Sequence, residues 1–340
     1  MQLNFFRRVS LLAVVILVLG LVSGVVVAQD SSETLTIYSG RSEDLIAPLI
    51  EQFSAATGVN VEVRYGSSAE MAATILEEGD NSPADVYISQ DAGTLGAVGA
   101  EGRLRVLTPD VLERVAAQFS AADGTWVGLS GRARVLVYNT ELVSVDELPA
   151  SLVDLANPEW SGRIGWAPTN ASFQSHVTAL RLLLGEDATR AWLEGLVANG
   201  AVPYENNRAV VQAVIDGEVQ VGLVNHYYLL GFLAENPDLP AANYFFPAGD
   251  VGELVNVAGA GVVSTSDTPA LAERFILYLL GADAQTYFRD ETYEYPLAAG
   301  VQPNEILPPL DTLVMPELDL SDLNDLQGTL ELLSSVGATP

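Results

Sequence analysis

The sequence predicts an α/β protein whose open, mainly parallel sheet carries helices on both faces. Strand-like and helix-like segments alternate from residue 35 to residue 102, which is the order of a βαβαβ unit. A long β-rich stretch at 125–143 and further extended sequence at 254–266 interrupt the helical segments that follow. No low-complexity linker separates two modules. We therefore expect two lobes that share strands rather than two independent domains.

The first third of the chain gives the clearest pattern. The segment at 42–58 begins with Ser42, carries apolar residues at helical spacing and ends at Gly58, as expected of a capped amphipathic helix. Strands are expected at 35–40, 59–66 and 84–89, and further helices at 68–80 and 92–102. Ligands of such sheets bind beyond the carboxyl ends of the strands. Those ends are residues 38–43, 64–70 and 88–93.

The remaining elements complete two lobes. Strands are expected at 162–169 and 219–225, and helices at 173–185, 187–200, 208–218, 269–290 and 316–337, the last one acidic and amphipathic. We assign residues 34–133 and 258–310 to an N-terminal lobe and residues 134–257 to a C-terminal lobe. Residues 311–340 are expected to form a helical segment packed on the lobes.

The N-terminus has the pattern of an export signal. Two arginines precede an uncharged apolar run, and a polar stretch follows Ala28. Residues 1–28 are therefore predicted to be a cleaved signal peptide. The apolar run is also long enough to span a bilayer, so an uncleaved N-terminal anchor stays open as the alternative. In both cases the rest of the chain is exported and works in the periplasm or another extracytoplasmic space.

Composition excludes several classes of function. The chain has no cysteine, which excludes disulfides, thiolate metal sites and cysteine nucleophiles. Its net charge of −29 would be repelled by nucleic acid and by an anionic membrane surface. All basic residues are arginines, so a phosphate-binding P-loop, which needs a lysine, is absent, and no GxSxG motif is present either. We predict that the protein is not an enzyme.

Two adjacent tyrosines follow the predicted strand at 219–225. On a continuing strand Tyr227 and Tyr228 would point to opposite faces of the sheet. If Asn225 instead begins a helix, both lie in its first turn, where the helix dipole and free N–H groups stabilise an ionised oxygen. Phenolate oxygens are hard donors that suit ferric iron. Adjacent tyrosines are also common as ordinary packing aromatics, and the pair alone does not decide between the two.

Several blocks of the sequence, in the same order, resemble the bacterial ferric-ion-binding proteins. These are the substrate-binding components of iron ABC importers. The resemblance covers the chain from about residue 35 to its C-terminal helix. It is carried by LTIYSGRSEDLI (35–46), LEEGDNSPADVYISQDAG (76–93), WVGLSGRARVLVYN (126–139), VQAVIDGEVQVGLVNHYY (211–228) and TYEYPLAAGV (292–301). It implies a two-lobed periplasmic-binding-protein fold of type II topology, with the ligand held in the cleft between the lobes.

The resemblance also implies roles for particular residues. Tyr227 and Tyr228 match the tyrosine pair that ligates ferric iron in the family. Ser42 stands where well-known members have a ligating histidine, and Gln90, followed by Asp91, stands where they have a carboxylate. Two phenolates do not fill an octahedral ferric site. Further ligands are therefore needed, and Asp91, Gln90, Ser42 and His226 are candidates for the metal or for positions behind its ligands.

An anion is the expected source of the missing ligands. In the family a synergistic anion is held by a loop that here contains Asn170, Ala171 and Ser172, and by asparagines that match Asn207 and Asn225. The loop precedes a helix, whose N–H groups suit an anion. We expect carbonate, phosphate or citrate as the anion, or iron delivered as a small chelate.

Ordinary structural roles compete with several of these assignments. Arg41 can pair bidentately with the anion, or form a salt bridge to Glu43 or Asp44. Asp91 can cap the helix at 92–102, and the asparagines can serve turns and helix caps. His226, next to the tyrosine pair, is expected behind the metal ligands or at the surface. His176 is expected to be a packing residue.

The sequence thus predicts an exported solute-binding protein that captures ferric iron in an interlobe cleft and passes it to an ABC permease. We expect a monomer that meets the membrane only through the permease or an uncleaved anchor. The alternative is a binding protein of the same fold that takes an organic or inorganic anion without iron.

Overall fold

In a computed structural model, which describes residues 33–339, ten strands form one continuous mixed sheet. The strands follow the order β2-β1-β3-β9-β4-β7-β5-β6, and β8 and β10 each pair with β4. Their bounds are β1 Thr34–Ser39, β2 Asn60–Tyr65, β3 Val86–Ser89, β4 Val127–Asn139, β5 Ile164–Trp166, β6 Val202–Pro203, β7 Val221–Asn225, β8 Ala241–Tyr244, β9 Val255–Val262 and β10 Tyr295–Pro296.

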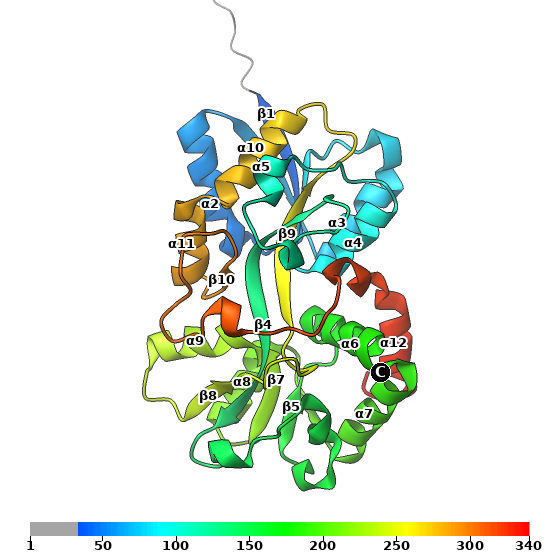
Figure 1. Cartoon of the computed structure of the whole chain (residues 1–340), viewed down its shortest axis with the longest axis vertical. Helices are drawn as coiled ribbons and strands as arrows, with labels where there is room; N and C mark the ends of the chain where they lie inside the picture. Colours follow the sequence, from blue (N-terminus) through cyan, green and yellow to red (C-terminus); the bar gives the residue numbers. More distant parts are fainter. Residues whose placement is uncertain (1–32, 340) are drawn as a thin grey trace, which may run out of the picture. The chain divides into compact units, whose positions relative to one another are not determined.

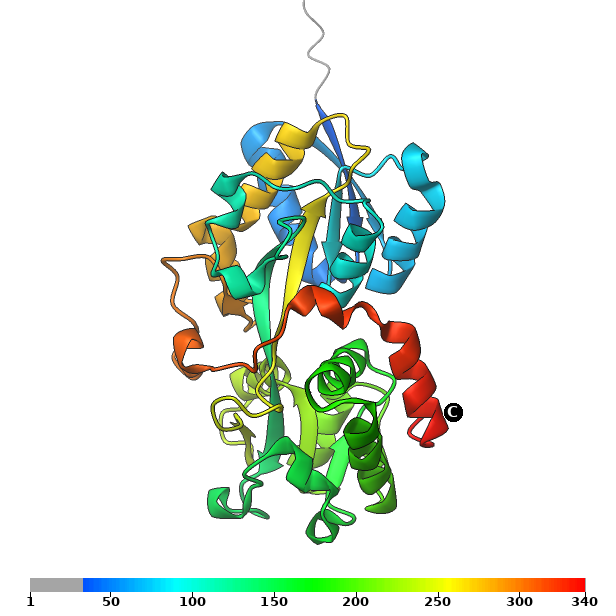
Figure 2. The same ribbon diagram turned by 45° about the vertical axis from the view of Figure 1, so that its right-hand side comes forward.

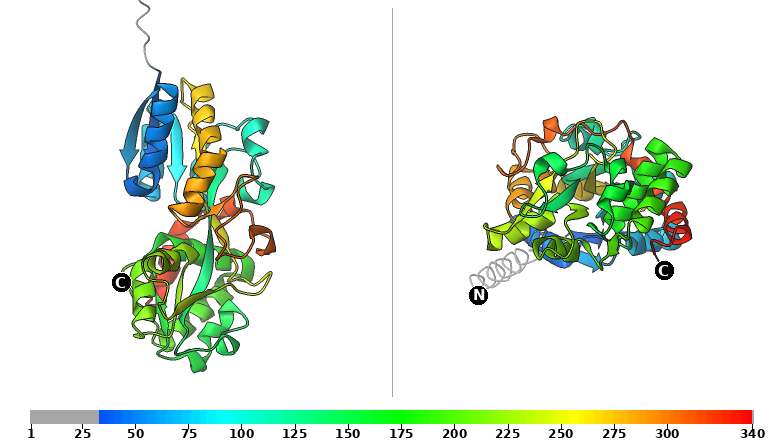
Figure 3. Two further views of the ribbon diagram at one scale, coloured as in Figure 1. Left: turned by 90° about the vertical axis from the view of Figure 1, so that its left-hand side faces the viewer. Right: turned by 90° about the horizontal axis from the view of Figure 1, so that it is seen from below.

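The N-terminal half of the sheet is a three-layer structure. Strands β1, β2 and β3 are parallel, and β9 joins β3 in the antiparallel direction. Helices α2, α10 and α11 cover one face and α3 and α4 the other (Figures 1 and 3). These helices are α2 Glu43–Thr57, α3 Ser68–Glu78, α4 Ala92–Ala100, α10 Pro269–Leu279 and α11 Ala282–Asp290, with the short α5 Pro109–Leu112 beside them.

The first helix shows why these segments fold as they do. Buried Ile46, Leu49, Ile50 and Phe53 recur at helical spacing and pack on the sheet, as the sequence predicts. Gly58 ends α2 with a φ of 74°, a left-handed conformation that glycine adopts without steric cost.

The C-terminal half repeats this layering. Strands β5, β6 and β7 are parallel, while β4 runs antiparallel to β7 and β8. Helices α6 and α7 cover one face of this half, and α8 and α9 cover the other. Their bounds are α6 Ala171–Leu184, α7 Glu186–Ala198, α8 Asn207–Ile215 and α9 His226–Glu235.

Strand β4 belongs to both halves. Its residues 127–133 pair with β9, and its residues 134–138 pair with β7 (Figure 1). The two lobes are therefore joined by shared strands, and the fold class predicted from the sequence is confirmed. The exact lobe boundaries given above stay a prediction.

Two long predicted helices are each divided in the structure. The segment 269–290 forms α10 and α11, because Gly281 adopts an extended conformation (φ −77°, ψ 159°) at the start of α11. The segment 316–337 forms a 3-10 helix, η7 (Leu320–Asn324), and α12 (Leu326–Ser335). Asp325 interrupts it because its side chain accepts a hydrogen bond from the Gly328 N–H and begins a new helix. The other 3-10 helices are η1 Gly79–Asn81, η2 Ala117–Phe119, η3 Val145–Glu147, η4 Leu152–Ala156, η5 Pro158–Trp160 and η6 Leu310–Thr312.

The C-terminal segment crosses from one half of the sheet to the other (Figure 2). Its η7 turn lies directly on α4, where a Cβ on Gly93 or Gly96 would collide with backbone carbonyls of η7. Its last helix, α12, packs on α6, where the hydroxyls of Thr178 and Thr329 lie 2.7 Å apart. Arg181 and Asp325 add an ion pair at 2.9 Å. The segment thus contacts both lobes.

The predicted signal peptide or anchor, residues 1–28, lies outside the described residues. Within 33–339, none of the helices combines the length and apolar character that a membrane span requires.

Candidate functional site

Tyr227 and Tyr228 lie in the first turn of α9, immediately after β7. Their rings stack with centroids 4.3 Å apart and planes inclined by 29°, and both side chains are partly exposed. The chain therefore turns as the sequence analysis expected, and the two phenols lie side by side. Burial raises the pKa of Tyr227, and the neighbouring Tyr228 raises it further, while Arg132 opposes the shift. Without a bound cation this phenol is protonated at neutral pH.

Two arginines of β4 lie near the tyrosine pair. Arg132 and Arg134 are both 3% exposed and, two residues apart on a strand, share one face of it. Arg134 Nη1 donates to Asn225 Oδ1 at 3.0 Å and to Ser172 Oγ at 3.3 Å. Its Nε and Nη2 and the Nε of Arg132 have no hydrogen-bond partner among the described residues. Burial lowers the pKa of Arg134 to about 10, which leaves it charged at neutral pH.

A polar network connects this arginine to the first turn of α6. Asn170 begins α6 and accepts the Ser172 N–H at 3.0 Å. Asn207, fully buried at the start of α8, donates through Nδ2 to Asn170 Oδ1 and Ser172 Oγ, each at 3.0 Å. Its Oδ1 has no partner among the described residues. The structure therefore brings together Asn170, Ala171, Ser172, Asn207 and Asn225, with Arg134 at their centre.

Asn225 makes a contact with Arg134 that the sequence analysis did not predict. It occupies the N-cap position, but its side chain makes no cap hydrogen bond. Its Oδ1 is directed to Arg134 instead. The residue thus links the tyrosine helix to the charged face of β4.

His226 is buried rather than at the surface. Its Nδ1 accepts the Ala133 N–H at 3.1 Å, and its Nε2 lies 2.9 Å from the carbonyl oxygen of Tyr293. Burial lowers the pKa of His226 to about 4, which keeps the ring neutral. With both ring nitrogens engaged, His226 has no lone pair for a metal. It fixes the start of α9 from behind, with its ring centroid 5.8 Å from that of Tyr227.

Arg41 is not at the cluster around Arg134. It is fully buried and forms a two-point ion pair with Glu294, with Nη2–Oε2 at 3.0 Å and Nη1–Oε1 at 3.3 Å. Burial alone would raise the pKa of Glu294, but the Arg41 guanidinium, with Arg132 and two hydrogen bonds, holds it below its ordinary value. The predicted anion binding by Arg41 is therefore wrong. The alternative prediction, a salt bridge from Arg41 to Glu43 or Asp44, is also wrong, because the acidic partner is Glu294.

The three remaining predicted residues lie at strand ends of the N-terminal lobe. Ser42 is exposed at the start of α2 and makes no side-chain cap bond. Asp91 caps α4, with Oδ1 accepting the Thr94 N–H at 3.0 Å, so the capping role weighed above is confirmed. Burial raises the pKa of Asp91 despite that hydrogen bond. Gln90 keeps a buried Oε1 without a partner among the described residues.

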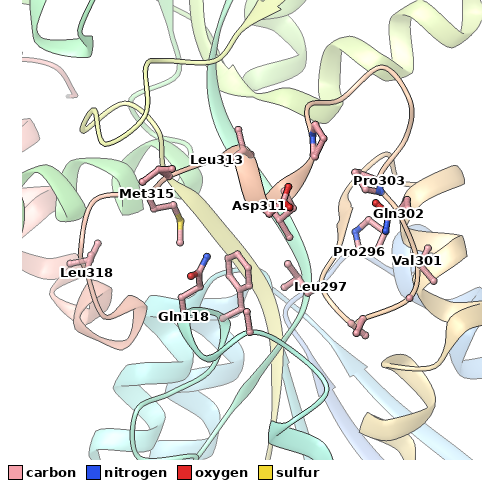
Figure 4. Close-up of a pocket in the computed structure, with 18 of the residues that line it drawn as sticks. Gln118, Pro296, Leu297, Val301, Gln302, Pro303, Asp311, Leu313, Met315 and Leu318 are labelled. Atoms are coloured by element: carbon pink, nitrogen blue, oxygen red, sulfur yellow. The ribbon is translucent and has the colours of Figure 1, made fainter.

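Of two sizeable cavities formed by the described residues, only the smaller is lined by predicted site residues. One of about 450 Å³ lies between strand ends of the N-terminal lobe and the first turns of α6, and it is lined by Gln90, Asp91 and Ala171 among others. A larger one of about 910 Å³ lies under the C-terminal segment, between Gln118, Leu297 and Met315 (Figure 4). None of the predicted site residues lines the larger cavity, so size alone does not mark the functional site.

The donors fit one kind of metal chemistry. Among residues 33–339 no three His, Cys, Asp or Glu side chains group as a metal site would require. The tyrosine pair offers two oxygen donors, which favour a hard, strongly acidic cation. The unsatisfied guanidinium N–H groups favour an anion.

Arg132 and Arg134 are functional candidates that the sequence analysis missed. A signal was present, since two arginines alternate within an otherwise apolar strand that had to be buried. Buried charges require partners, and the β4 sequence itself supplies none. That combination pointed to a ligand or to a distant acidic residue.

The chain is similar to known iron-binding proteins over most of its length. An Fe(3+)-binding periplasmic protein of Serratia marcescens is 33% identical over 91% of this chain and 92% of its own length. The crystal structure of iron-bound HitA from Pseudomonas aeruginosa superposes with a TM-score of 0.83 at 35% identity, over 90% of this chain and 99% of that one. A Trichodesmium protein (IdiA, FutA) in complex with iron and citrate has a TM-score of 0.79 at 29% identity, over 90% and 100% of the two chains.

The match extends to a defined family. Residues 39–286 match the family of bacterial extracellular solute-binding proteins, whose members bind substrates for transport. The chain belongs to this family and, within it, to the ferric-ion-binding proteins of iron import systems that its sequence resembles.

Proposed function

We propose that this protein is exported and captures ferric iron in its interlobe cleft for delivery to an ABC permease. Tyr227 and Tyr228 bind the metal as phenolates. The observation that carries this proposal is the stacked tyrosine pair beside two buried arginines whose N–H groups are not all satisfied. Ferric-iron-binding relatives that align over nearly the whole chain support it.

A bound anion completes the coordination sphere in this proposal. Arg134 has two nitrogens without a partner in the described part of the chain and is already oriented by Asn225 and Ser172. An oxyanion placed there would satisfy the guanidinium and turn further oxygens to the metal. Carbonate, phosphate and citrate all carry oxygens that can accept such hydrogen bonds and ligate a metal.

Charge balance explains why metal and anion would bind together. Two phenolates neutralise part of a trivalent cation, and the anion brings further negative charge. The positive charges of Arg132 and Arg134 offset the charge of the anion and so lower the free-energy cost of burying it. Cargo is bound and released without covalent change, so the protein is not a catalyst.

The test is the visible charge-transfer band between phenolate and ferric iron. The chain lacking residues 1–28 is titrated with ferric citrate, and with ferric iron plus carbonate or phosphate. We expect a band that the double variant Tyr227→Phe, Tyr228→Phe abolishes. Tyr278→Phe is the matched control, because Tyr278 lies on α10 away from the site and should leave the band unchanged.

One observation favours the second candidate function, an anion-binding protein without iron. Arg134 offers its free N–H groups whether or not a metal is present. Calorimetry with phosphate, carbonate or citrate alone distinguishes the two. Tight anion binding combined with the lack of any iron band would exclude iron and leave the anion as the cargo.

A further inference from the structure

The cavity of about 450 Å³ lies in the cleft and has walls from both lobes. Gln90, Thr94 and Ala97 line it from the N-terminal lobe, and Ala171, Gln174 and Ser175 line it from α6. Its volume lies in the range of small-molecule sites, which is roughly 300–1,000 Å³. It is too large to be explained by one inorganic anion.

The lining is nearly free of charge. Asp91 is the one charged residue among the described residues that line it, and its carboxylate already caps α4. The other polar groups are hydroxyls and amides, set among alanines, glycines and the leucines Leu76, Leu323 and Leu326. A carboxylate or phosphate inside this cavity would meet no positive partner and would be repelled by Asp91. The lining therefore suits an uncharged molecule.

Gln90 adds a directional preference. Its main-chain N–H donates to Ser68 Oγ at 2.9 Å, which fixes the backbone, while its side-chain Oε1 is buried and finds no partner within residues 33–339. A buried acceptor without a donor is unfavourable, so a hydroxyl or N–H of a ligand would be stabilised there.

The cavity adjoins the proposed anion position. Ala171 lines the cavity, and the next residue, Ser172, accepts a hydrogen bond from Arg134. A molecule with its charged end at Arg134 could therefore extend an uncharged portion past the first turn of α6 into the cavity.

We propose that this protein takes ferric iron as a chelate of a hydroxy acid whose uncharged, hydroxyl-bearing tail occupies the cavity beside Gln90. The chelating carboxylate and hydroxyl stay with the iron and Arg134. This inference rests on the proposed function and narrows its anion to an organic class.

The experiment compares three α-hydroxy acids as ferric chelates. Glycolate has no tail, gluconate has an uncharged polyhydroxyl tail, and citrate has charged arms. Dissociation constants are measured for the protein and for Ala97→Met, which places a larger side chain into the cavity. The ratio of variant to parent for one chelate cancels the stability of the chelate itself. Ala100→Met, exposed at the end of the same helix, is the control.

We expect Ala97→Met to weaken ferric gluconate binding at least tenfold while glycolate and citrate change less than twofold. Gln90→Leu, which removes the free acceptor, should weaken gluconate alone by a smaller factor of about three to ten. Equal effects on all three chelates, or none on gluconate, would overturn the inference. If the unaltered protein shows no phenolate-to-iron band with any chelate, the proposed function itself fails, and the inference with it.

Discussion

Two arginine sites lie along β4, and they differ in how their charge is met. At one site Arg41 forms an ion pair with Glu294, and Ser130 of β4 donates to the same carboxylate at 2.7 Å. At the other, Arg134 touches only the neutral oxygens of Asn225 and Ser172 and keeps two nitrogens free among the described residues. Ser130, Arg132 and Arg134 alternate along the strand and so lie on one face of it.

This difference separates a structural charge from one that is available to a ligand. Glu294 neutralises the charge of Arg41, so this ion pair offers no unpaired charge to a solute, although Arg41 Nε also has no hydrogen-bond partner among the described residues. A buried guanidinium without an acidic partner is unfavourable in the empty protein and becomes favourable when an anion arrives. The same residue type therefore supports the fold at one position and, in our proposal, binding at the other.

The largest expected effect comes from breaking the buried ion pair between Arg41 and Glu294. Glu294→Gln leaves Arg41 as a buried, unpaired charge, and we expect the free energy of unfolding to fall by about 3–5 kcal/mol. Urea denaturation followed by fluorescence measures this. Glu291→Gln, an exposed neighbour, should change it by less than about 0.5 kcal/mol. Equal stability of the two variants would contradict a structural role for the Arg41–Glu294 pair.

Arg134→Met should give the opposite pattern. We expect the affinity for iron with its anion to fall by about 2–3 kcal/mol, because a buried partner of the anion is lost. The free energy of unfolding should change by no more than about 1–2 kcal/mol, since the lost hydrogen bonds go to neutral acceptors. Titration of the charge-transfer band and urea denaturation measure the two quantities. Arg208→Met, on the exposed side of α8, is the control.

These two sites also mark what the sequence could predict. Elements with strong periodicity, such as α2 with Ile46 and Phe53, were predicted nearly to the residue, because local pattern determines them. The divided helices were missed, because the breaks at Gly281 and Asp325 depend on single turns within continuous apolar patterns.

The candidate site was predicted in part for the same reason. The turn at Tyr227 and Tyr228 follows from local sequence, and the resemblance supplied the polar loop around Asn170. The partner of Arg41 could not be predicted, because Glu294 lies 253 residues away in the chain. Arg134 was overlooked because only the folded sheet shows which charges find acidic partners.

Iron binding next to Arg134 should release protons from the tyrosine pair, and the Arg41 site should release none. The pKa of Tyr227 is raised by burial, so the phenol is protonated before iron arrives and must lose its proton on binding. Apparent iron affinity should therefore rise with pH, by about tenfold per pH unit for each proton released. Calorimetry in buffers of different ionisation enthalpy counts these protons. Tyr227→Phe should release about one proton fewer than the unaltered protein at the same pH with the same chelate. An unchanged proton count would contradict phenolate ligation by Tyr227.

The smallest expected effect is the contribution of His176 to the pH dependence of folding, because the charge of Arg134 helps to lower the pKa of His176. Burial, and after it the positive Arg134, lower the pKa of His176 to about 3, against about 6.5 in the unfolded chain. The unfolded state therefore binds the proton first. The stability contribution is complete above about pH 6.5 and is lost as the pH falls toward the folded value.

Between pH 7 and pH 6 this linkage removes about 0.7 kcal/mol of folding free energy for such a histidine. His176→Gln should remove that share of the pH dependence, and His226, the only other histidine, should account for a similar share. Urea denaturation of both proteins at the two pH values measures the difference. In Arg134→Met one cause of the low His176 pKa is gone, so the pKa of His176 in the folded protein should rise. The loss of folding free energy with acid should therefore begin at the same pH as in the unaltered protein and stop at a higher pH. An identical pH profile down to pH 4 in that variant would show that Arg134 does not act on His176.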